Sequence, residues 1–265
     1  MDAVEGAQTF QVAGSAYDGF MGRYSTPLAS RFAAVSGVVR GQSVLDLGCG
    51  PGALTGVLAA LLGPGSVGAC DPSPPFVAAC RERNPGVEVR PGRAEAIPFD
   101  DDSFDGALAQ LVLHFVSDPG QAMAELQRVV RPGGTVAACV WDFAGGMEML
   151  RRFWDAALAV DTDAPDEAST LRFGRAGEIA SLFEEAGFVD IAESTIEVES
   201  TYSGFEELWS GFQAGIGPAG SYCVSLPDDQ QLALRQELFR LLNSPTGPFT
   251  LAAAARYSVA RTAVS

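Results

Sequence analysis

The chain has 265 residues, of which 47% are hydrophobic, and this composition predicts a packed globular protein rather than a disordered one. Its formal net charge of −16 repels the phosphates of nucleic acids and anionic lipid surfaces, so neither is expected as a partner. Solubility alone accounts for such acidity, and a small neutral or basic substrate is compatible with it.

The N-terminal segment, residues 1–40, is predicted to be a helical arm that caps another part of the protein. Its aromatic residues, among them Tyr17, Phe20 and Tyr24, suit a helix that packs over something. The segment begins with acidic residues and lacks the basic and then apolar form of a signal peptide. No apolar run of the chain is long enough to span a membrane, and we expect a cytoplasmic protein.

From residue 43 to residue 141, short apolar runs alternate with stretches of helical periodicity. Strands are predicted at 43–47, 67–70, 87–90, 104–110 and 135–141. Helices are predicted at 53–62, at 74–83 and from Pro119 to the break at 132–134. Asp118 can cap the last of these helices, and Pro119 suits its first position. Strands that alternate with helices indicate βαβ units and hence a parallel sheet.

The later chain is less regular. Helices are predicted at 147–160, 175–186, 203–214 and 227–242, with a loop at 215–220, a strand at 189–198 and a last, antiparallel strand at 248–262. The fold class is therefore α/β, a doubly wound, seven-stranded and mostly parallel sheet. We expect one domain over 41–265, with a core at 43–141 and substrate-side insertions at about 143–175 and 203–245.

Cysteine and histidine usage argues against a metal site. The five cysteines form no CxxC pair, and His114 is the single histidine, so no metal is expected. Three cysteines lie in or beside the predicted strands, where a cysteine is usually a small buried hydrophobic residue. This usage favours the reducing cytosol.

A glycine-rich segment, residues 44–52, follows the first strand. The strand carries an acid, Asp46, and Gly48, Gly50 and Gly52 come after it. Glycines let the backbone turn sharply and let a ligand approach without interference from a Cβ atom. The next helix directs free N–H groups at whatever binds there, and a crevice opens beyond the carboxyl ends of such strands. A strand-to-helix turn that merely requires glycine is the alternative interpretation.

The glycine spacing separates two cofactor classes. A dinucleotide fingerprint is GxGxxG, which brings the backbone against a pyrophosphate, whereas the pattern here is Gly48-x-Gly50-x-Gly52. A cofactor without phosphate is therefore favoured. Asp71 ends the second strand, where a carboxylate can accept hydrogen bonds from both ribose hydroxyls of an adenosine. A turn before Pro72 is the alternative role for this acid.

Taken together, residues 43–141 resemble the class I S-adenosylmethionine-dependent methyltransferases, in the branch (methyltransferase type 11) that includes ubiquinone/menaquinone-biosynthesis C-methyltransferases. The matching stretches are 44–52, 71–73, 92–99, 102–105 and 126–134. The resemblance implies S-adenosylmethionine as methyl donor, S-adenosylhomocysteine as product and a small-molecule acceptor. The resemblance extends to residues 150–265 only as an expectation from the fold, because no motif of the family is matched there.

The resemblance also implies roles for individual residues. Cofactor contacts are expected from Tyr17, Arg23, Asp46, Gly48, Cys49, Gly50, Gly52, Asp71, Pro72, Ala94, Glu95, Gln110 and Leu111. Asp46 would face the methionine amino group, directly or through water, and Asp71 would hold the ribose. The backbone N–H of Ala94 would face an adenine ring nitrogen, and Gln110 would contact the methionine moiety.

Two of these expectations carry explicit alternatives. Many relatives have an aspartate at the position of Arg93, which has no hydrogen-bond acceptor. Either Glu95 or a backbone carbonyl takes over that contact to adenine, or the arginine stacks on the ring. In the arm, Tyr17 would cover the cofactor and Arg23 would pair with its carboxylate, unless the arm residues simply pack a cap helix.

Methyl transfer needs a general base only if the acceptor must lose a proton. Two candidates follow the fourth and fifth strands, His114 and Asp142. For His114 a packing or capping role is favoured, and Asp142 is equally well explained as a solvated loop acid. The other functions considered are a non-catalytic S-adenosylmethionine-binding protein and an NAD(P)-dependent oxidoreductase. Monomer and homodimer are both open.

Overall fold

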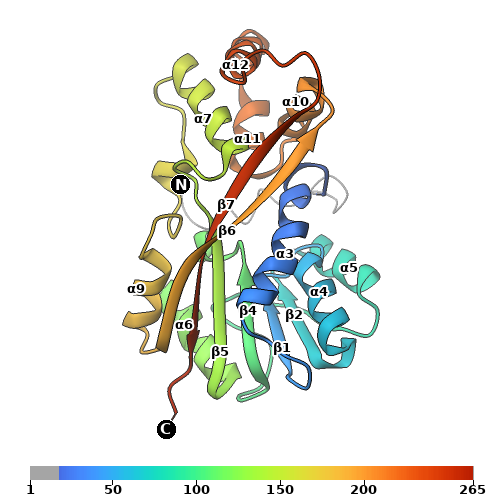
Figure 1. Cartoon of the computed structure of the whole chain (residues 1–265), viewed down its shortest axis with the longest axis vertical. Helices are drawn as coiled ribbons and strands as arrows, with labels where there is room; N and C mark the ends of the chain where they lie inside the picture. Colours follow the sequence, from blue (N-terminus) through green and yellow to red (C-terminus); the bar gives the residue numbers. More distant parts are fainter. Residues whose placement is uncertain (1–17, 265) are drawn as a thin grey trace.

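A computed structural model describes residues 18–264 of the chain, so the proposed contact of Tyr17 lies outside the described residues. Seven strands of the described part form one sheet in the order β3-β2-β1-β4-β5-β7-β6 (Figure 1). They are β1 (Val44–Leu47), β2 (Val67–Asp71), β3 (Glu88–Pro91), β4 (Phe104–Gln110), β5 (Val130–Trp141), β6 (Val189–Tyr202) and β7 (Phe249–Arg261).

The first five strands of the chain run parallel, and β7 lies antiparallel between β5 and β6. This arrangement confirms the predicted fold class, including the antiparallel last strand. Because parallel strands share a direction, the ends of β1, β2 and β4 meet at one edge of the sheet. The residues that follow these strands are thereby brought together.

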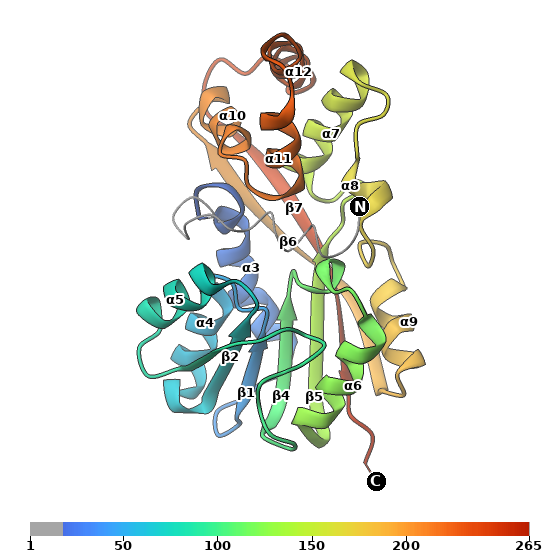
Figure 2. The same ribbon diagram turned by 180° about the vertical axis from the view of Figure 1, so that it is seen from behind.

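The helices are η1 (Asp18–Gly22), α3 (Arg23–Val35), α4 (Ala53–Leu62), η2 (Pro64–Ser66), α5 (Pro74–Arg83), η3 (Leu113–Phe115), α6 (Pro119–Val129), α7 (Glu148–Val160), α8 (Glu167–Thr170), α9 (Glu178–Glu185), α10 (Phe205–Gln213), α11 (Gly217–Ser225) and α12 (Asp228–Leu241). Helices α3 and α4 lie on one face of the sheet, whereas α6 and α9 lie on the other (Figures 1 and 2). Strands β6 and β7 continue past the parallel strands to a second group of helices, α7, α10, α11 and α12. No described helix combines the length and the apolar character that crossing a membrane requires.

Helix α6 shows how local sequence sets these elements. The carboxylate of Asp118 accepts a hydrogen bond from the backbone N–H of Gln121 at 3.0 Å, which confirms the predicted cap. The apolar residues Ala122, Met123, Leu126 and Val129 recur at helical spacing, and all four are buried. The helix ends at Val129, and β5 begins at once with Val130. The Pro132-Gly133-Gly134 break lies within β5, where the pairing with β4 shifts register.

Two further elements differ from the sequence-based expectation, besides the early start of β5. The predicted loop at 215–220 is wrong, because α11 begins at Gly217. A Cβ atom at Gly220 would lie 2.8 Å from the backbone carbon of Gly215, so glycine allows α11 to pack closely against the end of α10. The four-residue helix α8 was not predicted. It begins where the Asp166 carboxylate accepts the backbone N–H of Ala168.

Candidate functional site

A cavity opens where β1, β2 and β4 end. It is lined by Gly48, Gly50, Asp71, Pro72, Ser73, Phe76, Gln110, Leu111, Val112 and Phe115, and its volume is about 120 Å³. Six of these residues were predicted from the sequence as cofactor contacts. The structure therefore gathers the glycine loop, the acid that ends β2 and the residues at the end of β4 around one space, which we call the loop cavity.

Asp71 holds this loop in place. Its two carboxylate oxygens accept the backbone N–H groups of Gly50 at 2.9 Å and Ser73 at 2.8 Å. The side chain is 7% exposed, and burial raises the pKa of the carboxyl group. Each oxygen keeps a further lone pair for a ligand hydroxyl. Asp71 thus combines loop support with an acceptor group beside the cavity.

The three predicted glycines have different surroundings, although all have positive φ angles. At Gly50 a Cβ atom would meet nothing within 4 Å. At Gly48 it would press on the side chain of Val112, and at Gly52 on Asn84 and Cys80. Only Gly50 leaves open space at the cavity. Gly52 does not line the loop cavity, and both its positive φ angle and the close approach of α5 require glycine there.

We expect Gly52→Ala to lower the free energy of unfolding by roughly 3 kcal/mol, because it adds backbone strain and overlap with Asn84 and Cys80. Gly50→Ala should lower the free energy of unfolding by about 1 kcal/mol, since it adds only the strain of a left-handed backbone conformation. Its methyl group should instead weaken binding in the loop cavity. Urea unfolding and calorimetry with S-adenosylmethionine measure the two effects separately. Equal losses of stability would contradict this division of roles.

Two buried polar atoms at this cavity have no hydrogen-bond partner among the described residues. They are Gln110 Oε1 and the Ser73 hydroxyl oxygen. The other end of the Gln110 amide donates to the Ser25 carbonyl at 3.0 Å, which fixes the side chain. An unpaired buried polar atom costs free energy, so a ligand that supplies partners is favoured. The cavity therefore fits a polar ligand with hydrogen-bond donors.

Asp46 and Cys49 lie behind the loop rather than on the cavity. Asp46 is 1% exposed and accepts the Thr55 hydroxyl at 2.6 Å. Burial raises its pKa to about 8. Cys49 packs in a separate buried cluster with Cys80 and Val77. Cys49 does not line the loop cavity, so its expected contact with the cofactor stays a prediction.

Ala94 and Glu95 belong to the loop that leads from β3 to β4, and neither lines the loop cavity. The Glu95 carboxylate accepts the backbone N–H groups of Ser117 at 2.9 Å and Asp118 at 3.3 Å. Burial raises the pKa of Glu95, but these hydrogen bonds outweigh it and leave that pKa lowered. Arg93 lies 3.6 Å from the same carboxylate. Glu95 therefore ties two loops together.

Arg23 is engaged elsewhere. Its guanidinium forms an ion pair with Glu207 at 2.8 Å, donates to the Thr201 carbonyl at 2.9 Å and stacks over the Tyr202 ring at 3.8 Å. These contacts join the start of α3 to β6 and α10. The contact of Arg23 with a cofactor carboxylate stays a prediction, since in this structure its charge is paired with Glu207 and it does not line the loop cavity.

A second cavity adjoins the first. Its lining is Phe20, Met21, Leu111, His114, Phe115, Trp141, Phe143, Leu150, Glu167, Ile216, Gly217, Pro218 and Ala219, and we call it the apolar cavity. Leu111 and Phe115 line both spaces. Leu111 has a φ of 62°, a left-handed conformation that is costly for a leucine and typical of functional sites. The space measures about 40 Å³ and is narrower than the loop cavity.

His114 lies among aromatic rings in the apolar cavity. Its ring centroid is 3.9 Å from that of Phe115 and 5.3 Å from that of Phe143. Burial lowers its pKa to about 3, so the imidazole is neutral at physiological pH. Its Nδ1 atom has no hydrogen-bond partner among the described residues. The histidine is thus packed among aromatic rings beside this cavity and has one buried polar atom without a partner.

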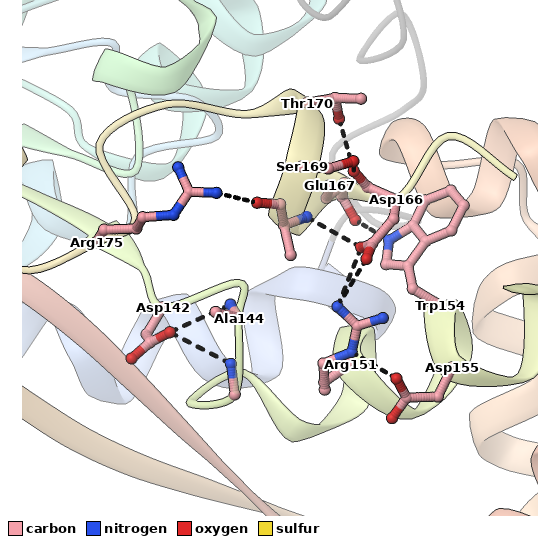
Figure 3. A network of polar contacts seen from close by, with 12 residues as sticks. Asp142, Ala144, Arg151, Trp154, Asp155, Asp166, Glu167, Ser169, Thr170 and Arg175 are labelled. Atoms are coloured by element: carbon pink, nitrogen blue, oxygen red, sulfur yellow. Dashed lines mark hydrogen bonds and ion pairs between the residues drawn. The ribbon is translucent and has the colours of Figure 1, made fainter.

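Asp142 was the other candidate base, and the structure places it away from both cavities. Its carboxylate accepts the backbone N–H groups of Ala144 at 3.2 Å and Gly145 at 3.3 Å (Figure 3). The other oxygen pairs with Arg256 of β7 at 2.8 Å. Asp142 lines neither cavity. Because both of its oxygens are bonded and neither faces a cavity, it shapes the turn after β5.

Sequence reasoning missed Glu167, which reaches the apolar cavity from α8. No motif marks this residue, since α8 was not predicted. A wider groove of about 930 Å³ lies along α6 and α9 and contains none of the predicted site residues. Within residues 18–264, no group of three or more His, Cys, Asp or Glu residues is placed to hold a metal ion.

Comparison with known proteins agrees with this geometry. Residues 45–138 match the family described as "Methyltransferase domain". The chain is 40% identical over 106 residues to a ubiquinone/menaquinone biosynthesis C-methyltransferase of Hahella chejuensis, covering 37% of this chain and 43% of that protein. It is 39% identical over 115 residues to a malonyl-[acyl-carrier protein] O-methyltransferase of Salmonella typhimurium, covering 43% and 44%. The chain thus spans less than half the length of these curated relatives.

The fold also matches solved structures. A phosphoethanolamine N-methyltransferase 2 of Haemonchus contortus, solved with phosphomonomethylethanolamine and S-adenosylhomocysteine, superposes with a TM-score of 0.55. The sequences are 15% identical, and the match covers 89% of this chain and 52% of that one. At this identity the likeness concerns the fold alone. Together with the family match, these comparisons confirm the resemblance inferred from the glycine motif.

Proposed function

We propose that this chain, whose residues 45–138 match the methyltransferase family, moves the methyl group of S-adenosylmethionine to a small-molecule acceptor. The observation that supports this proposal best is the meeting of two unlike cavities at Leu111 and Phe115. The loop cavity offers unpaired polar atoms and a carboxylate, which suit the donor. The apolar cavity suits the reacting end of an acceptor.

The residues present fit the proposed donor. Asp71 would accept hydrogen bonds from the ribose hydroxyls, and Gln110 Oε1 would accept one from the methionine amino group. Gly50 leaves room for the ligand because it has no Cβ atom. When bound, S-adenosylmethionine supplies a methyl group on a positively charged sulfur that is ready for displacement. The walls position the reacting groups and exclude water, which supplies much of the rate in such transfers.

The acceptor side is built largely from segments outside the core. The apolar cavity takes Leu150 from α7, Glu167 from α8 and Pro218 from α11. These residues belong to the segments predicted as substrate-side insertions, about 143–175 and 203–245. We therefore keep the assignment of 41–265 as one methyltransferase domain in which these segments, with the arm before residue 40, select the acceptor.

The test has a binding step and a transfer step. Calorimetry with S-adenosylmethionine, S-adenosylhomocysteine, NAD and NADP should show binding of the first two only. Incubation with methyl-labelled S-adenosylmethionine and the small-molecule fraction of a source lysate should then yield a labelled product. Asp71→Ala serves as the control that loses both signals.

Each competing function makes a different prediction in the same experiment. An NAD(P)-dependent oxidoreductase would bind a nicotinamide cofactor and not S-adenosylmethionine. A non-catalytic protein would bind S-adenosylmethionine tightly and label no product in any fraction. Either result would overturn the proposal, and the two are distinguished by the binding step.

A further inference from the structure

The apolar cavity contains one carboxyl group among the described residues that line it, that of Glu167. The Glu167 residue is only 3% exposed. Apart from His114, its neighbours in the lining are hydrophobic residues, a proline and a glycine. A carboxyl group in such surroundings is costly unless it is paired or serves a purpose.

The nearby arginine does not pair with Glu167. The guanidinium of Arg151 forms ion pairs with Asp155 at 2.9 Å and with Asp166 at 2.9 Å (Figure 3). Glu167 instead receives one hydrogen bond, from the indole N–H of Trp154 to Oε2 at 2.7 Å. The network in Figure 3 therefore fixes the orientation of Glu167 without neutralising its charge.

Burial raises the pKa of Glu167 to about 7, so it exchanges a proton near neutral pH. Asp166 raises this pKa further, whereas the Trp154 hydrogen bond and the charge of Arg151 lower it. From η3, His114 faces the same cavity and is neutral. Arg175 donates to the Ala168 carbonyl of α8. From α11, Tyr222 packs on Trp154 and gives its hydroxyl to Asp161.

We propose that Glu167 is a catalytic residue that accepts the proton of the acceptor's hydroxyl group, and that the acceptor is an uncharged, mainly apolar molecule bearing that hydroxyl. The inference rests on the proposed function. The narrow apolar walls disfavour a charged acceptor, because burying a charge there is costly. A hydroxyl oxygen loses its proton when it is methylated, and Glu167 is placed to receive it.

The step balances in atoms and charge. A lone pair of the acceptor oxygen forms a bond to the methyl carbon while the bond from that carbon to sulfur breaks, and the sulfur keeps the electron pair. The hydroxyl proton passes to the ionised carboxylate of Glu167. One positive charge on sulfur and one negative charge on Glu167 both disappear. In a low-dielectric cavity this loss of opposite charges requires little reorganisation of the surroundings.

The attraction between the positive sulfur of S-adenosylmethionine and the Glu167 carboxylate can be tested without the acceptor. The pKa of Glu167 is measured by infrared difference titration of the whole protein, with Glu167→Gln to assign the carboxyl band. We expect a value near 7 with S-adenosylhomocysteine bound and a value about one unit lower with S-adenosylmethionine, whose positive sulfur favours the ionised carboxylate. The Asp155→Asn variant, altered in the same network but outside the cavity, should show the same response.

Two failures are distinguishable. Absence of S-adenosylmethionine binding in calorimetry would overturn the proposed function. Binding that leaves the Glu167 pKa the same in both complexes would overturn the present inference alone. Glu167→Gln retains an oxygen that can accept the Trp154 N–H, so the variant used for assignment preserves the network of Figure 3.

The acceptor class is tested with the S-adenosylhomocysteine complex and three probes, 4-ethylphenol, ethylbenzene and 4-ethylbenzoate. We expect 4-ethylphenol to bind at least tenfold more tightly than the other two, because only it offers a neutral hydroxyl to Glu167. In Glu167→Leu this preference over ethylbenzene should vanish, while Asp155→Asn keeps it. Absence of any preference for the phenol in the parent protein, including no measurable binding, would overturn the acceptor class.

Discussion

Replacing Asp71 with alanine is expected to weaken S-adenosylmethionine binding about 100-fold. The carboxylate holds the Gly50 and Ser73 backbone N–H groups at 2.9 and 2.8 Å, so its loss releases the glycine loop. In our proposal it also accepts from the ribose hydroxyls. Hydrogen bonds to a charged group contribute about 1.5–3 kcal/mol each, and the loss of two accounts for the expected factor. Calorimetry with S-adenosylmethionine measures it.

Asp142 offers a matched control for this variant. It also lies at the end of a strand and accepts two backbone N–H groups, from Ala144 and Gly145, but it lines neither cavity. Asp142→Ala should lower the melting temperature through the loss of its turn and its pair with Arg256. It should change the Kd for S-adenosylmethionine by no more than about twofold, which is far less than a tenfold change. Equal affinity losses in the two variants would show that Asp71 acts only through loop stability.

The residues of the loop cavity were predictable because their positions are local to the parallel strands. Gly50 follows β1, Asp71 ends β2 and Gln110 ends β4, and strands of one direction must deliver their ends to one edge. Alternation of apolar runs and helices was enough to identify these strands. For this part of the chain, a local pattern therefore determines which residues meet.

Other residues depend on contacts that no local pattern records. The ion-pair partner of Arg23 is Glu207, which is 184 positions away in the sequence. Because this contact depends on how α3 packs against α10, no pattern near Arg23 could predict it. Asp142 has the expected place after β5, but β7 brings Arg256 beside it. Glu167 reaches its cavity from a four-residue helix. These three positions follow from tertiary packing, in which long-range partners override local expectation.

The glycine motif illustrates the same division within nine residues. Its regular spacing predicted one shared role for Gly48, Gly50 and Gly52. In the structure Gly50 faces open space, whereas Gly52 meets Asn84 and Cys80 of the α5 segment. A positive φ angle at all three positions explains the choice of glycine in each case. The regular spacing therefore predicts the backbone conformation of the three glycines, whereas the side chains packed around each one determine whether it faces the loop cavity.

The second large effect concerns Asp46, whose replacement by asparagine is expected to stabilise the ligand-free protein. Burial raises the pKa of this carboxyl group from 3.8 to about 8. A raised pKa contributes stability that is fully present below the unfolded value and is lost as pH rises through the folded value. The parent protein should therefore lose stability from about pH 4 to pH 8, and the variant should not. At pH 7 we expect Asp46→Asn to gain roughly 2 kcal/mol in the free energy of unfolding, since the new amide offsets part of the benefit.

Urea unfolding between pH 4 and pH 9 tests the sign. The control is Asp105→Asn on the neighbouring strand β4, because the Ser43 N–H and Arg131 lower the pKa of Asp105. That variant should lose stability above pH 4, the opposite direction. A gain for Asp46→Asn that does not change with pH would contradict the titration of Asp46. Above pH 8, where the parent Asp46 is ionised, the same variant should bind S-adenosylmethionine about tenfold more weakly, because a buried negative charge behind the glycine loop favours a cationic ligand. Stability gained and affinity lost together would show that the buried acid is kept for binding at the expense of stability.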